Sequence, residues 1–280
     1  MPNLTGHAAE HPCFSPSAHV RSGRIHLPVA PRCNLQCAYC DRRYDCPNES
    51  RPGVASSLLT PEAAVERTAQ ALKMAPHIRV AGVAGPGEPL ENPETFETLE
   101  RLHRQFPDLL LCVSTNGLLL PQFLDTLLSC GVVTLTITIN AVTVETAANL
   151  YNTVRWKGTV LSREAGASLL LGQQRRGLTL AAAAGLIVKV NMVLVPGVND
   201  REPPAVARMA AEAGAALMNL TPLIPCGRLS GVRPPTTEEL SHARSQAAQY
   251  LPQFTHCRQC RADACGIPGC EPAECAEASG

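Results

Sequence analysis

The sequence predicts an α/β fold in which a parallel sheet forms an open or partial barrel of the TIM type, a (β/α)6 arrangement. Apolar runs of strand length alternate with amphipathic runs of helix length along most of the 280 residues. Six strand–helix units in succession indicate a parallel sheet with right-handed crossovers. Because a closed barrel has eight such units, a sheet of six is expected to stay open on one side.

The six strands are apolar runs rich in aliphatic and β-branched residues, as expected of parallel strands that are buried on both faces. The run VVTLTITIN is the clearest of them. The strands are expected at residues 24–31, 77–85, 109–114, 132–140, 186–195 and 216–224.

Capping residues and the spacing of apolar side chains mark the helices between the strands. The first is expected to start at Thr60, because Pro61 suits the first helical position and Glu62 the first turn. The last is expected to run to about residue 251, because Thr236 and Glu239 have the spacing of a capping box. Other helices are expected from residue 92, over 121–131 and over 201–214, with two or three more within 141–185. The helix after residue 92 is expected to bury Phe96, Leu99, Leu102 and Phe106.

The chain is expected to have three parts: an N-terminal segment over 1–23, the barrel over 24–252 and a cysteine-rich tail over 253–280. The tail has almost no apolar periodicity and contains five of the thirteen cysteines. An odd number of cysteines cannot all pair within one chain, and this usage favours metal binding over disulfides. We therefore expect metal, and not core burial, to hold the tail.

Composition and charge exclude several classes of function. Lysine plus arginine and aspartate plus glutamate both number 24, and aromatic residues make up 4%, so the basic excess and stacking residues of a nucleic-acid binder are missing. A hydrophobic content of 45% disfavours a disordered chain. No signal-peptide pattern opens the sequence, and its longest apolar runs have strand length. We expect a cytoplasmic protein with reduced thiols and with no nucleic-acid or membrane partner.

The strongest motif is a cysteine triad, Cys33, Cys37 and Cys40, spaced C-x3-C-x2-C just after the first strand. Three thiolates at this spacing can bind three corners of a cubane iron–sulfur cluster and leave the fourth iron open to a substrate. A zinc site would normally need a fourth protein ligand. Zinc, or three inert buried cysteines, is the alternative interpretation.

Polar residues and glycines follow the later strands, at the edge of the barrel where reactive groups gather. Glu88 lies in the turn GPGEP after the second strand, where Gly87 lets the backbone approach a ligand. On their own, such residues are equally consistent with turns and helix caps. The candidate positions are Tyr39, Gly87, Glu88, Thr115, Asn116, Asn140 and Val195.

Together, the triad, the turn at Glu88 and the six-unit barrel resemble the radical S-adenosylmethionine (SAM) superfamily. The resemblance implies that the triad holds a 4Fe-4S cluster to which SAM binds. It also implies that Glu88 accepts hydrogen bonds from the SAM amino group and that Tyr39 borders the adenine. The other candidate positions would contact the ribose or the carboxylate of SAM.

Three further segments resemble the NifB family of nitrogenase iron–molybdenum cofactor maturases within that superfamily. They are HPC at 11–13, NESRPG at 48–53 and CRQCRADA at 257–264, and they extend the resemblance over almost the whole chain. Because the sequence ends soon after the tail, the short, stand-alone form of the family is expected, without an added carrier-protein domain.

The resemblance implies a carbide-inserting enzyme, of the lyase or transferase type, that serves FeMo-cofactor biosynthesis in nitrogen fixation. Two further 4Fe-4S precursor clusters would be fused with a carbide from a SAM methyl group and one extra sulfur, giving an eight-iron core. The implied partners are an iron–sulfur cluster donor, a ferredoxin-type electron donor, and carrier or scaffold proteins of nitrogenase assembly.

The same resemblance implies ligands for the two precursor clusters. The first cluster would be held by Cys13 and Cys112 with His11, or else His7. The second would be held by Cys257 and Cys260, with Cys265 or Cys270 as a third ligand; the alternative for this pair is zinc.

Glu49 and Arg51 are implied to act beside the reacting clusters, where Glu49 would relay a proton from the transferred methyl group. A surface ion pair is the alternative for these two residues. Cys46 and Cys130 are interpreted as small hydrophobic residues, and Cys226 and Cys275 have no assigned role.

Three other functions remain open on the sequence alone. One is a radical SAM enzyme that uses auxiliary iron–sulfur clusters and acts on an organic or peptide substrate. The second is a non-catalytic iron–sulfur carrier, which Glu88, Asn116 and Asn140 disfavour because a carrier needs no adenosyl pocket. The third is a zinc-binding regulator.

Overall fold

Six parallel strands form the central sheet, which confirms the predicted (β/α)6 arrangement. The structure is a computed structural model that describes residues 7–48 and 53–269. The sheet has the order β10-β1-β3-β4-β5-β8-β9, in which β10 is the antiparallel edge. The strands are β1 (Gly23–His26), β3 (Ile78–Val83), β4 (Leu110–Thr115), β5 (Val132–Thr138), β8 (Ile187–Leu194), β9 (Leu217–Pro222) and β10 (Cys265–Gly266).

β1 is shorter than the predicted run over 24–31. After His26 only isolated contacts continue the pairing, such as the hydrogen bond of 2.9 Å from the Leu27 N–H to the Gly82 carbonyl. The chain therefore leaves the sheet early and is directed toward the cysteine triad.

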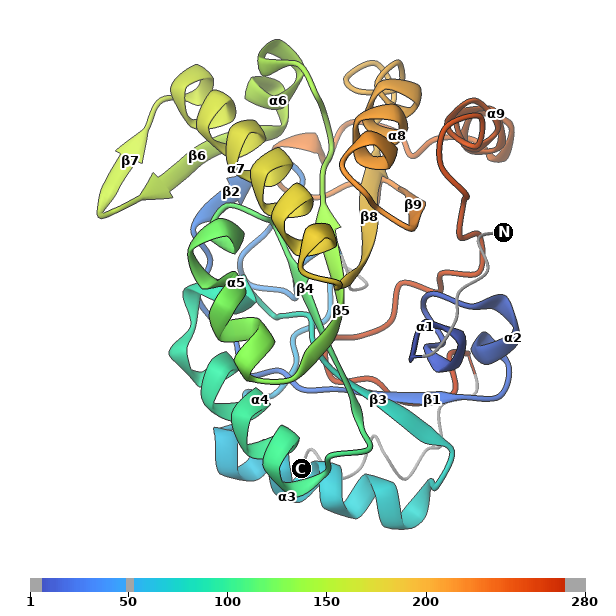
Figure 1. Cartoon of the computed structure of the whole chain (residues 1–280). Helices are drawn as coiled ribbons and strands as arrows, with labels where there is room; N and C mark the ends of the chain where they lie inside the picture. The colour runs from blue at the N-terminus through green and yellow to red at the C-terminus, as the bar shows by residue number, and fades with distance from the viewer. Residues whose placement is uncertain (1–6, 49–52, 270–280) are drawn as a thin grey trace.

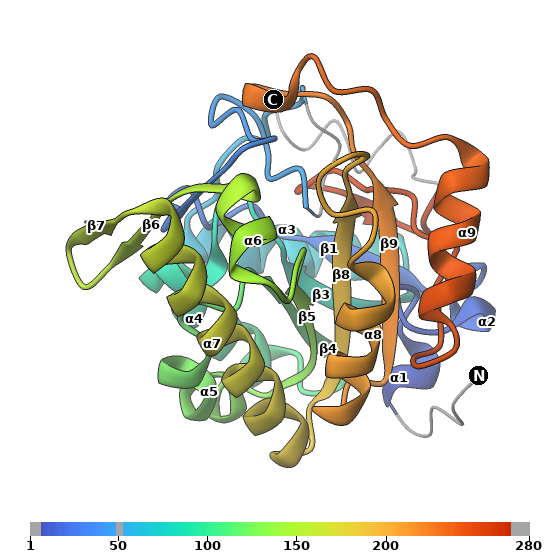
Figure 2. The same cartoon turned by 90° about the horizontal axis from the view of Figure 1, so that it is seen from above.

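The helices that follow the parallel strands wrap around the outer side of the curled sheet (Figure 1, Figure 2). They are α3 (Pro61–Met74), α4 (Pro93–Gln105), α5 (Leu120–Ser129), α7 (Arg163–Ala183), α8 (Pro203–Glu212) and α9 (Thr237–Ala247). Both predicted caps are confirmed: the Thr60 hydroxyl accepts from the Ala63 N–H, and Thr236 and Glu239 form a capping box. Shorter elements are α1 (His7–Glu10), α2 (Pro16–His19), α6 (Val144–Leu150) and the 3-10 turns η1 (Pro89–Glu91) and η2 (Gly227–Leu229).

The core lies between the sheet and these helices. α4 buries Leu99 and Leu102 as predicted. Phe96 and Phe106 are only half-buried, and Phe96 packs sideways against Phe123 of α5 with ring centroids 4.9 Å apart. Within residues 7–48 and 53–269, no helix has both the length and the apolar character that crossing a bilayer requires.

Residues 141–185 contain two helices, as expected, and also a β-hairpin that was not predicted. The hairpin consists of β6 (Tyr151–Trp156) and β7 (Thr159–Leu161). Its turn has positive φ at Lys157 (50°) and Gly158 (79°), the conformation of tight hairpin turns that match the twist of the strands. β6 also pairs with β2 (Leu35–Cys37), so the hairpin is bonded directly to the triad segment.

The described part of the tail corrects the expectation that metal, and not core burial, holds this segment. β10 pairs with β1, and the fully buried Arg24 donates a hydrogen bond of 2.6 Å to the Gly266 carbonyl. Arg67 of α3 donates another, also 2.6 Å, to the Asp263 carbonyl. Ala262, Ala264 and Cys265 are buried. Backbone pairing and burial therefore dock the described part of the tail, through a segment too short to show periodicity in the sequence.

Candidate functional site

The cysteine triad lines a pocket at the carboxyl ends of the strands. Strand β2 lies within the triad segment, and the Gln36 side-chain amide donates to the carbonyls of Cys37 and Cys40 at 3.3 and 3.0 Å. All three cysteines face a cavity with an empty volume of about 450 Å³. Cys37 is buried, whereas Cys33 and Cys40 are half-exposed.

The electrostatics of this pocket keep its thiols neutral in the metal-free protein. Burial raises the pKa of Cys33 to about 12, and the Glu88 carboxylate adds to the shift. Burial also raises the pKa of Cys37 well above its ordinary value, helped by the neighbouring thiols of Cys40 and Cys33. Because thiolates are the metal-binding form, iron must displace these protons when it binds.

Gly87 and Glu88, two of the predicted cofactor-binding residues, also line the triad pocket. A Cβ on Gly87 would lie 2.3 Å from the Arg32 carbonyl oxygen, so only glycine allows this close approach. The buried Glu88 carboxylate accepts hydrogen bonds from the Thr115 hydroxyl and from the Asn116 N–H, the latter at 2.7 Å. Burial raises the pKa of Glu88 to about 7, although these hydrogen bonds oppose the shift.

Asn140, Tyr39 and Val195 do not line the triad pocket. The Asn140 side chain is fully buried, donates to the Tyr39 hydroxyl and accepts the Val193 N–H at 2.8 Å. Val195 is likewise fully buried. Through these hydrogen bonds the buried Asn140 links the ends of β5 and β8 to the triad segment. Of the predicted cofactor-binding residues, the structure therefore brings four to the triad pocket: Gly87, Glu88, Thr115 and Asn116.

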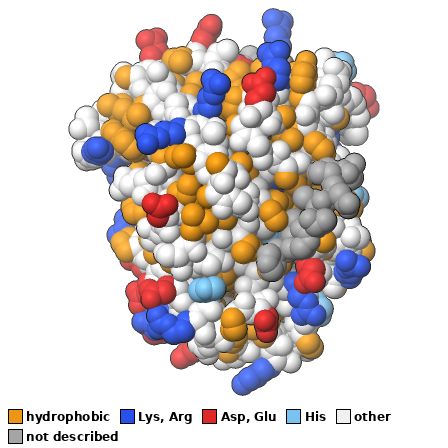
Figure 3. All heavy atoms as spheres, in the orientation of Figure 1, with side chains coloured by type: hydrophobic (Ala, Val, Ile, Leu, Met, Phe, Trp, Pro, Cys, Tyr) orange, Lys and Arg blue, Asp and Glu red, His pale blue; other side chains and the backbone are white. Residues whose placement is uncertain are grey.

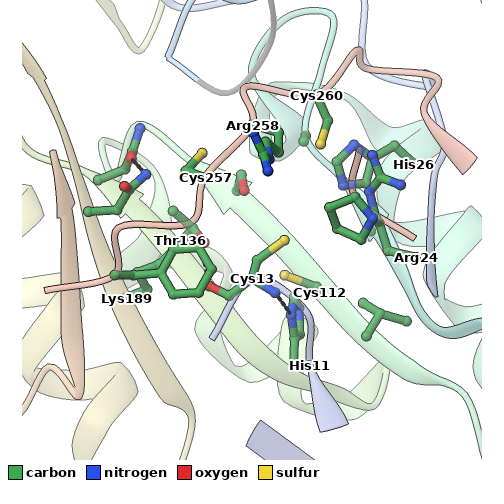
Figure 4. A pocket seen from close by; sticks show the side chains of 18 of the residues that line it. His11, Cys13, Arg24, His26, Cys112, Thr136, Lys189, Cys257, Arg258 and Cys260 are labelled. Carbon is green, nitrogen blue, oxygen red and sulfur yellow. Dashed lines mark hydrogen bonds between the residues drawn. The ribbon is translucent and has the colours of Figure 1, made fainter. Parts of the chain in front are cut away.

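A second pocket collects the other predicted ligands from three distant segments (Figure 4). Its empty volume is about 710 Å³. One side comes from the N-terminal segment, one from β4 and one from the tail, and Figure 4 shows Cys13 and Cys112 side by side above His11. The predicted ligands that line it are His11, Cys13, Cys112, Cys257 and Cys260.

The two pockets adjoin each other. Asn48, Ala84 and Ser114 line both of them. In the second pocket, burial raises the pKa of Cys13 to about 12, and the thiols of Cys260 and Cys257 also act to raise it. The tail thiols therefore lie near enough to Cys13 to influence its ionisation.

The hydrogen bonds of His11 and His26 determine which ring nitrogen of each carries the proton, and therefore whether Nε2 can bind a metal. His11 Nδ1 accepts the Cys13 N–H at 3.0 Å, so a neutral His11 carries its proton on Nε2. His26 Nδ1 lies 3.1 Å from the Arg261 carbonyl and must donate to it, which leaves the Nε2 lone pair available. A Cβ on Gly82 would lie 3.6 Å from the His26 ring and 3.7 Å from Cys112, so those two side chains flank one point of the pocket.

His26 was not among the ligands predicted from the sequence. Its position at the end of the first barrel strand is the feature that could have indicated it. Burial lowers its pKa to about 4, which keeps the imidazole neutral. His19 also lines the pocket and has the same tautomer, because its Nδ1 lies 2.9 Å from the Pro12 carbonyl.

Cys46 was interpreted as a small hydrophobic residue, but the structure places it in the triad pocket. Burial and the three triad thiols raise its pKa well above the ordinary value. The neighbouring Asp45 carboxylate accepts the Ala262 N–H at 3.4 Å, which ties this segment to the tail. By contrast, Cys265 lies in the apolar core, where Cys130 is also found as expected.

Some predicted residues lie outside what the structure describes. These are Glu49, Arg51, Cys270 and Cys275, together with the side chain of His7. In the described ranges, no three His, Cys, Asp or Glu side chains are close enough to hold one metal ion. The triad pocket fits a cubane cluster better than a single ion, because its three thiols surround a cavity of about 450 Å³.

Comparison with known proteins defines the class. Residues 27–210 match the model of the radical SAM superfamily, and the chain belongs to that superfamily. Among solved structures it resembles methylornithine synthase (PylB), with a TM-score of 0.53 and 16% identity over 89% of this chain and 67% of that one, a likeness of fold.

Within the superfamily, the chain is a member of the NifB family. It is 47% identical over 276 residues to the FeMo cofactor biosynthesis protein NifB of Klebsiella pneumoniae, covering 96% of this chain and 59% of that protein. It is 42% identical over 260 residues to the protein of the same name from Methanocaldococcus jannaschii, covering 92% of this chain and 86% of that one. The chain thus spans less than two thirds of the length of the Klebsiella relative.

Proposed function

We propose that the chain is the radical SAM enzyme of FeMo-cofactor biosynthesis that fuses two 4Fe-4S clusters around a SAM-derived carbide. Membership of the NifB family supports the pathway. The observation that carries the finer assignment is the convergence of five predicted ligands, from three distant segments, on one pocket that adjoins the triad pocket.

In the triad pocket, Cys33, Cys37 and Cys40 would hold the resident 4Fe-4S cluster. When bound, this cluster supplies the electron that cleaves SAM. Glu88 would hold the SAM ammonium group, because the carboxylate oxygen that accepts the Asn116 N–H retains a further lone pair. The close approach at Gly87 would keep this wall of the pocket rigid.

In the second pocket, the chain would hold two clusters as substrates. We assign Cys13, Cys112 and His26 to the first, because His26 presents its Nε2 lone pair beside Cys112. We assign Cys257 and Cys260 to the second, on the side where the two pockets adjoin. Cys46, which lines the triad pocket two residues before the shared Asn48, would be its third ligand in place of the core residue Cys265, and Cys270 lies outside the described residues. A neutral imidazole is a more labile ligand than a thiolate, which suits a cluster that must move during fusion.

The charge of the second pocket suits inorganic anions. Arg24, Lys189 and Arg258 line it, and Figure 4 shows them around the cysteines. No aspartate or glutamate is among its described lining residues. Clusters ligated by thiolates carry net negative charge, so these cations would stabilise them where an organic cation would be repelled.

The remaining steps follow from the NifB resemblance. A SAM methyl group would be transferred to a substrate cluster and converted to the central carbide, with Glu49 relaying a proton and Arg51 beside it. The chain would take clusters from an iron–sulfur donor, electrons from a ferredoxin-type protein, and pass its product to carrier or scaffold proteins.

Separating SAM cleavage from core formation tests this function. Cys33→Ser should abolish the formation of both 5′-deoxyadenosine and the eight-iron core. Cys257→Ser with Cys260→Ser should retain SAM cleavage and lose core formation, because only the substrate site is damaged. Cys130→Ser, in the core behind the sheet, is the control for thiol loss. Equal loss of both activities in the Cys257/Cys260 variant, with iron still bound at the triad, would contradict separate roles for the two pockets.

A further inference from the structure

A small antiparallel sheet projects from the barrel beside the triad. It has the order β2-β6-β7, and its hairpin extends away from the body of the molecule (Figure 1, Figure 2). One of its faces is covered, because Val154 packs against α7 so closely that a Cβ on Gly166 would lie 2.8 Å away. The other face, which we call the outer sheet face, is formed by Gln36, Thr153, Arg155 and Val160.

The outer sheet face is exposed yet continuous with the triad. Thr153 and Arg155 are exposed, and Val160 is 58% exposed. Thr153 pairs with Gln36, whose side chain is bonded to the carbonyls of Cys37 and Cys40. Since neighbouring strands lie about 5 Å apart, the middle of this face is within a strand or two of the triad backbone.

The charge on this face has one sign. Arg155 lies on it and Lys157 lies at the hairpin tip, and neither residues 34–37 nor residues 151–161 contain an acidic side chain. Figure 3 shows basic side chains at the left edge of the molecule, where the hairpin projects. A basic, largely polar face of this small size suits a weak, salt-dependent encounter with an acidic protein and not a permanent interface.

We propose that the outer sheet face is the docking site for a small acidic one-electron carrier protein. This inference rests on the proposed function, in which the cluster held by the triad must be reduced before SAM is cleaved. In the docked complex the reduced carrier gives up one electron, which the cluster takes up on going from the 2+ to the 1+ state, and no proton is transferred. The side of the triad facing the second pocket stays open to SAM and substrate.

The test is the rate at which the holoprotein is reduced, followed by visible absorbance without SAM. The probe is a small acidic 2Fe-2S ferredoxin, reduced beforehand, because its visible spectrum differs from that of a 4Fe-4S cluster. Arg155→Glu with Lys157→Glu should slow reduction at low ionic strength by at least about tenfold, because both attracting charges are reversed. The difference should shrink as salt is added. Photoreduced 5-deazaflavin, a small reductant that needs no protein docking, should reduce wild type and variant equally fast.

The matched control is Lys73→Glu with Arg79→Glu, which reverses two exposed charges at the end of α3 and the start of β3. It should leave the ferredoxin rate unchanged. Equal ferredoxin rates for wild type and the Arg155/Lys157 variant would overturn the docking site alone. A wild-type protein that even deazaflavin cannot reduce would contradict the proposed function itself, and the docking site with it.

Discussion

Glu88 shows how burial and hydrogen bonding compete at a single carboxyl group. Desolvation favours its neutral form, while the Thr115 hydroxyl and two backbone N–H groups favour the carboxylate. Desolvation prevails and the pKa rises to about 7. A cationic ammonium group placed beside it would reverse that balance, which is the property expected of a site for the amino group of SAM.

This balance predicts a pH dependence of stability in the metal-free protein. The pKa of Glu88 is about 7 in the folded protein against an ordinary value of 4.5, so the folded state binds the proton more tightly. The resulting stabilisation is present below about pH 4.5 and is lost as the pH rises through 7. Relative to Glu88→Gln, wild-type protein should therefore lose on the order of 1–3 kcal/mol of unfolding free energy between pH 5 and pH 8. Urea denaturation at the two pH values measures this difference, and a pH-independent difference would contradict a raised pKa.

The histidine ligand can be identified by a pair of matched substitutions. His26→Ala should remove the nitrogen signal of the substrate cluster in pulsed electron paramagnetic resonance, because His26 Nε2 carries the free lone pair. His11→Ala should leave that signal in place, since a neutral His11 carries its proton on Nε2. Loss of the signal in the His11 variant, with retention in the His26 variant, would reverse the assignment.

The sequence indicates the candidate site residues whose pattern is local. Cys33, Cys37 and Cys40 lie within eight residues, so spacing alone indicates a cluster. The proposed roles of His26 and Cys46 depend on the tertiary fold, which no local pattern encodes. His26 Nδ1 bonds to the Arg261 carbonyl of the tail, and Asp45, beside Cys46, accepts the Ala262 N–H. Asn140 follows the end of β5, as a rim residue should, but its side chain donates a hydrogen bond inward to the Tyr39 hydroxyl.

The predicted strands and helices of the barrel were confirmed where caps and apolar runs were strong. Thr60 and Thr236 begin α3 and α9 as expected, because a capping hydrogen bond is made within one helical turn. The β6–β7 hairpin and β10 escaped prediction because they are short and are stabilised by pairing with β2 and β1. Such pairing depends on the tertiary fold and leaves little trace in periodicity.

The docking of β10 yields a prediction for Arg67 of α3. Arg67→Met removes the hydrogen bond to the Asp263 carbonyl while keeping the side-chain length. Because a hydrogen bond from a charged group contributes about 1.5–3 kcal/mol, the tail should open more often. Hydrogen exchange of the His26 amide, which donates to the Ala264 carbonyl at 2.8 Å, should accelerate accordingly.

Arg101→Met is the control for this effect. Arg101 is a half-exposed residue of α4 whose partners, Glu62 and Glu97, are exposed. Arg101→Met should change the free energy of unfolding by less than about 0.5 kcal/mol and leave hydrogen exchange of the His26 amide unaltered. Unchanged exchange in the Arg67 variant would show that the tail is held by something other than this contact.

In the whole molecule, the two pockets meet at the carboxyl ends of β3 and β4. The N-terminal segment and the tail reach the second pocket from opposite ends of the chain, and the triad pocket shares Asn48, Ala84 and Ser114 with it. In the proposed function, a SAM-derived group would pass directly between these adjoining pockets. The sequence indicated each segment but not that they meet.

Iron, acid-labile sulfide and zinc per chain, measured after anaerobic reconstitution, test this arrangement most directly. Three four-iron clusters predict about twelve irons with matching sulfide and no zinc. The Cys33→Ser variant should lose about four irons, and the Cys257→Ser, Cys260→Ser variant should lose a different four. About four irons in the wild-type protein, with zinc bound at the tail, would leave a radical SAM protein but contradict a second pocket that holds two substrate clusters.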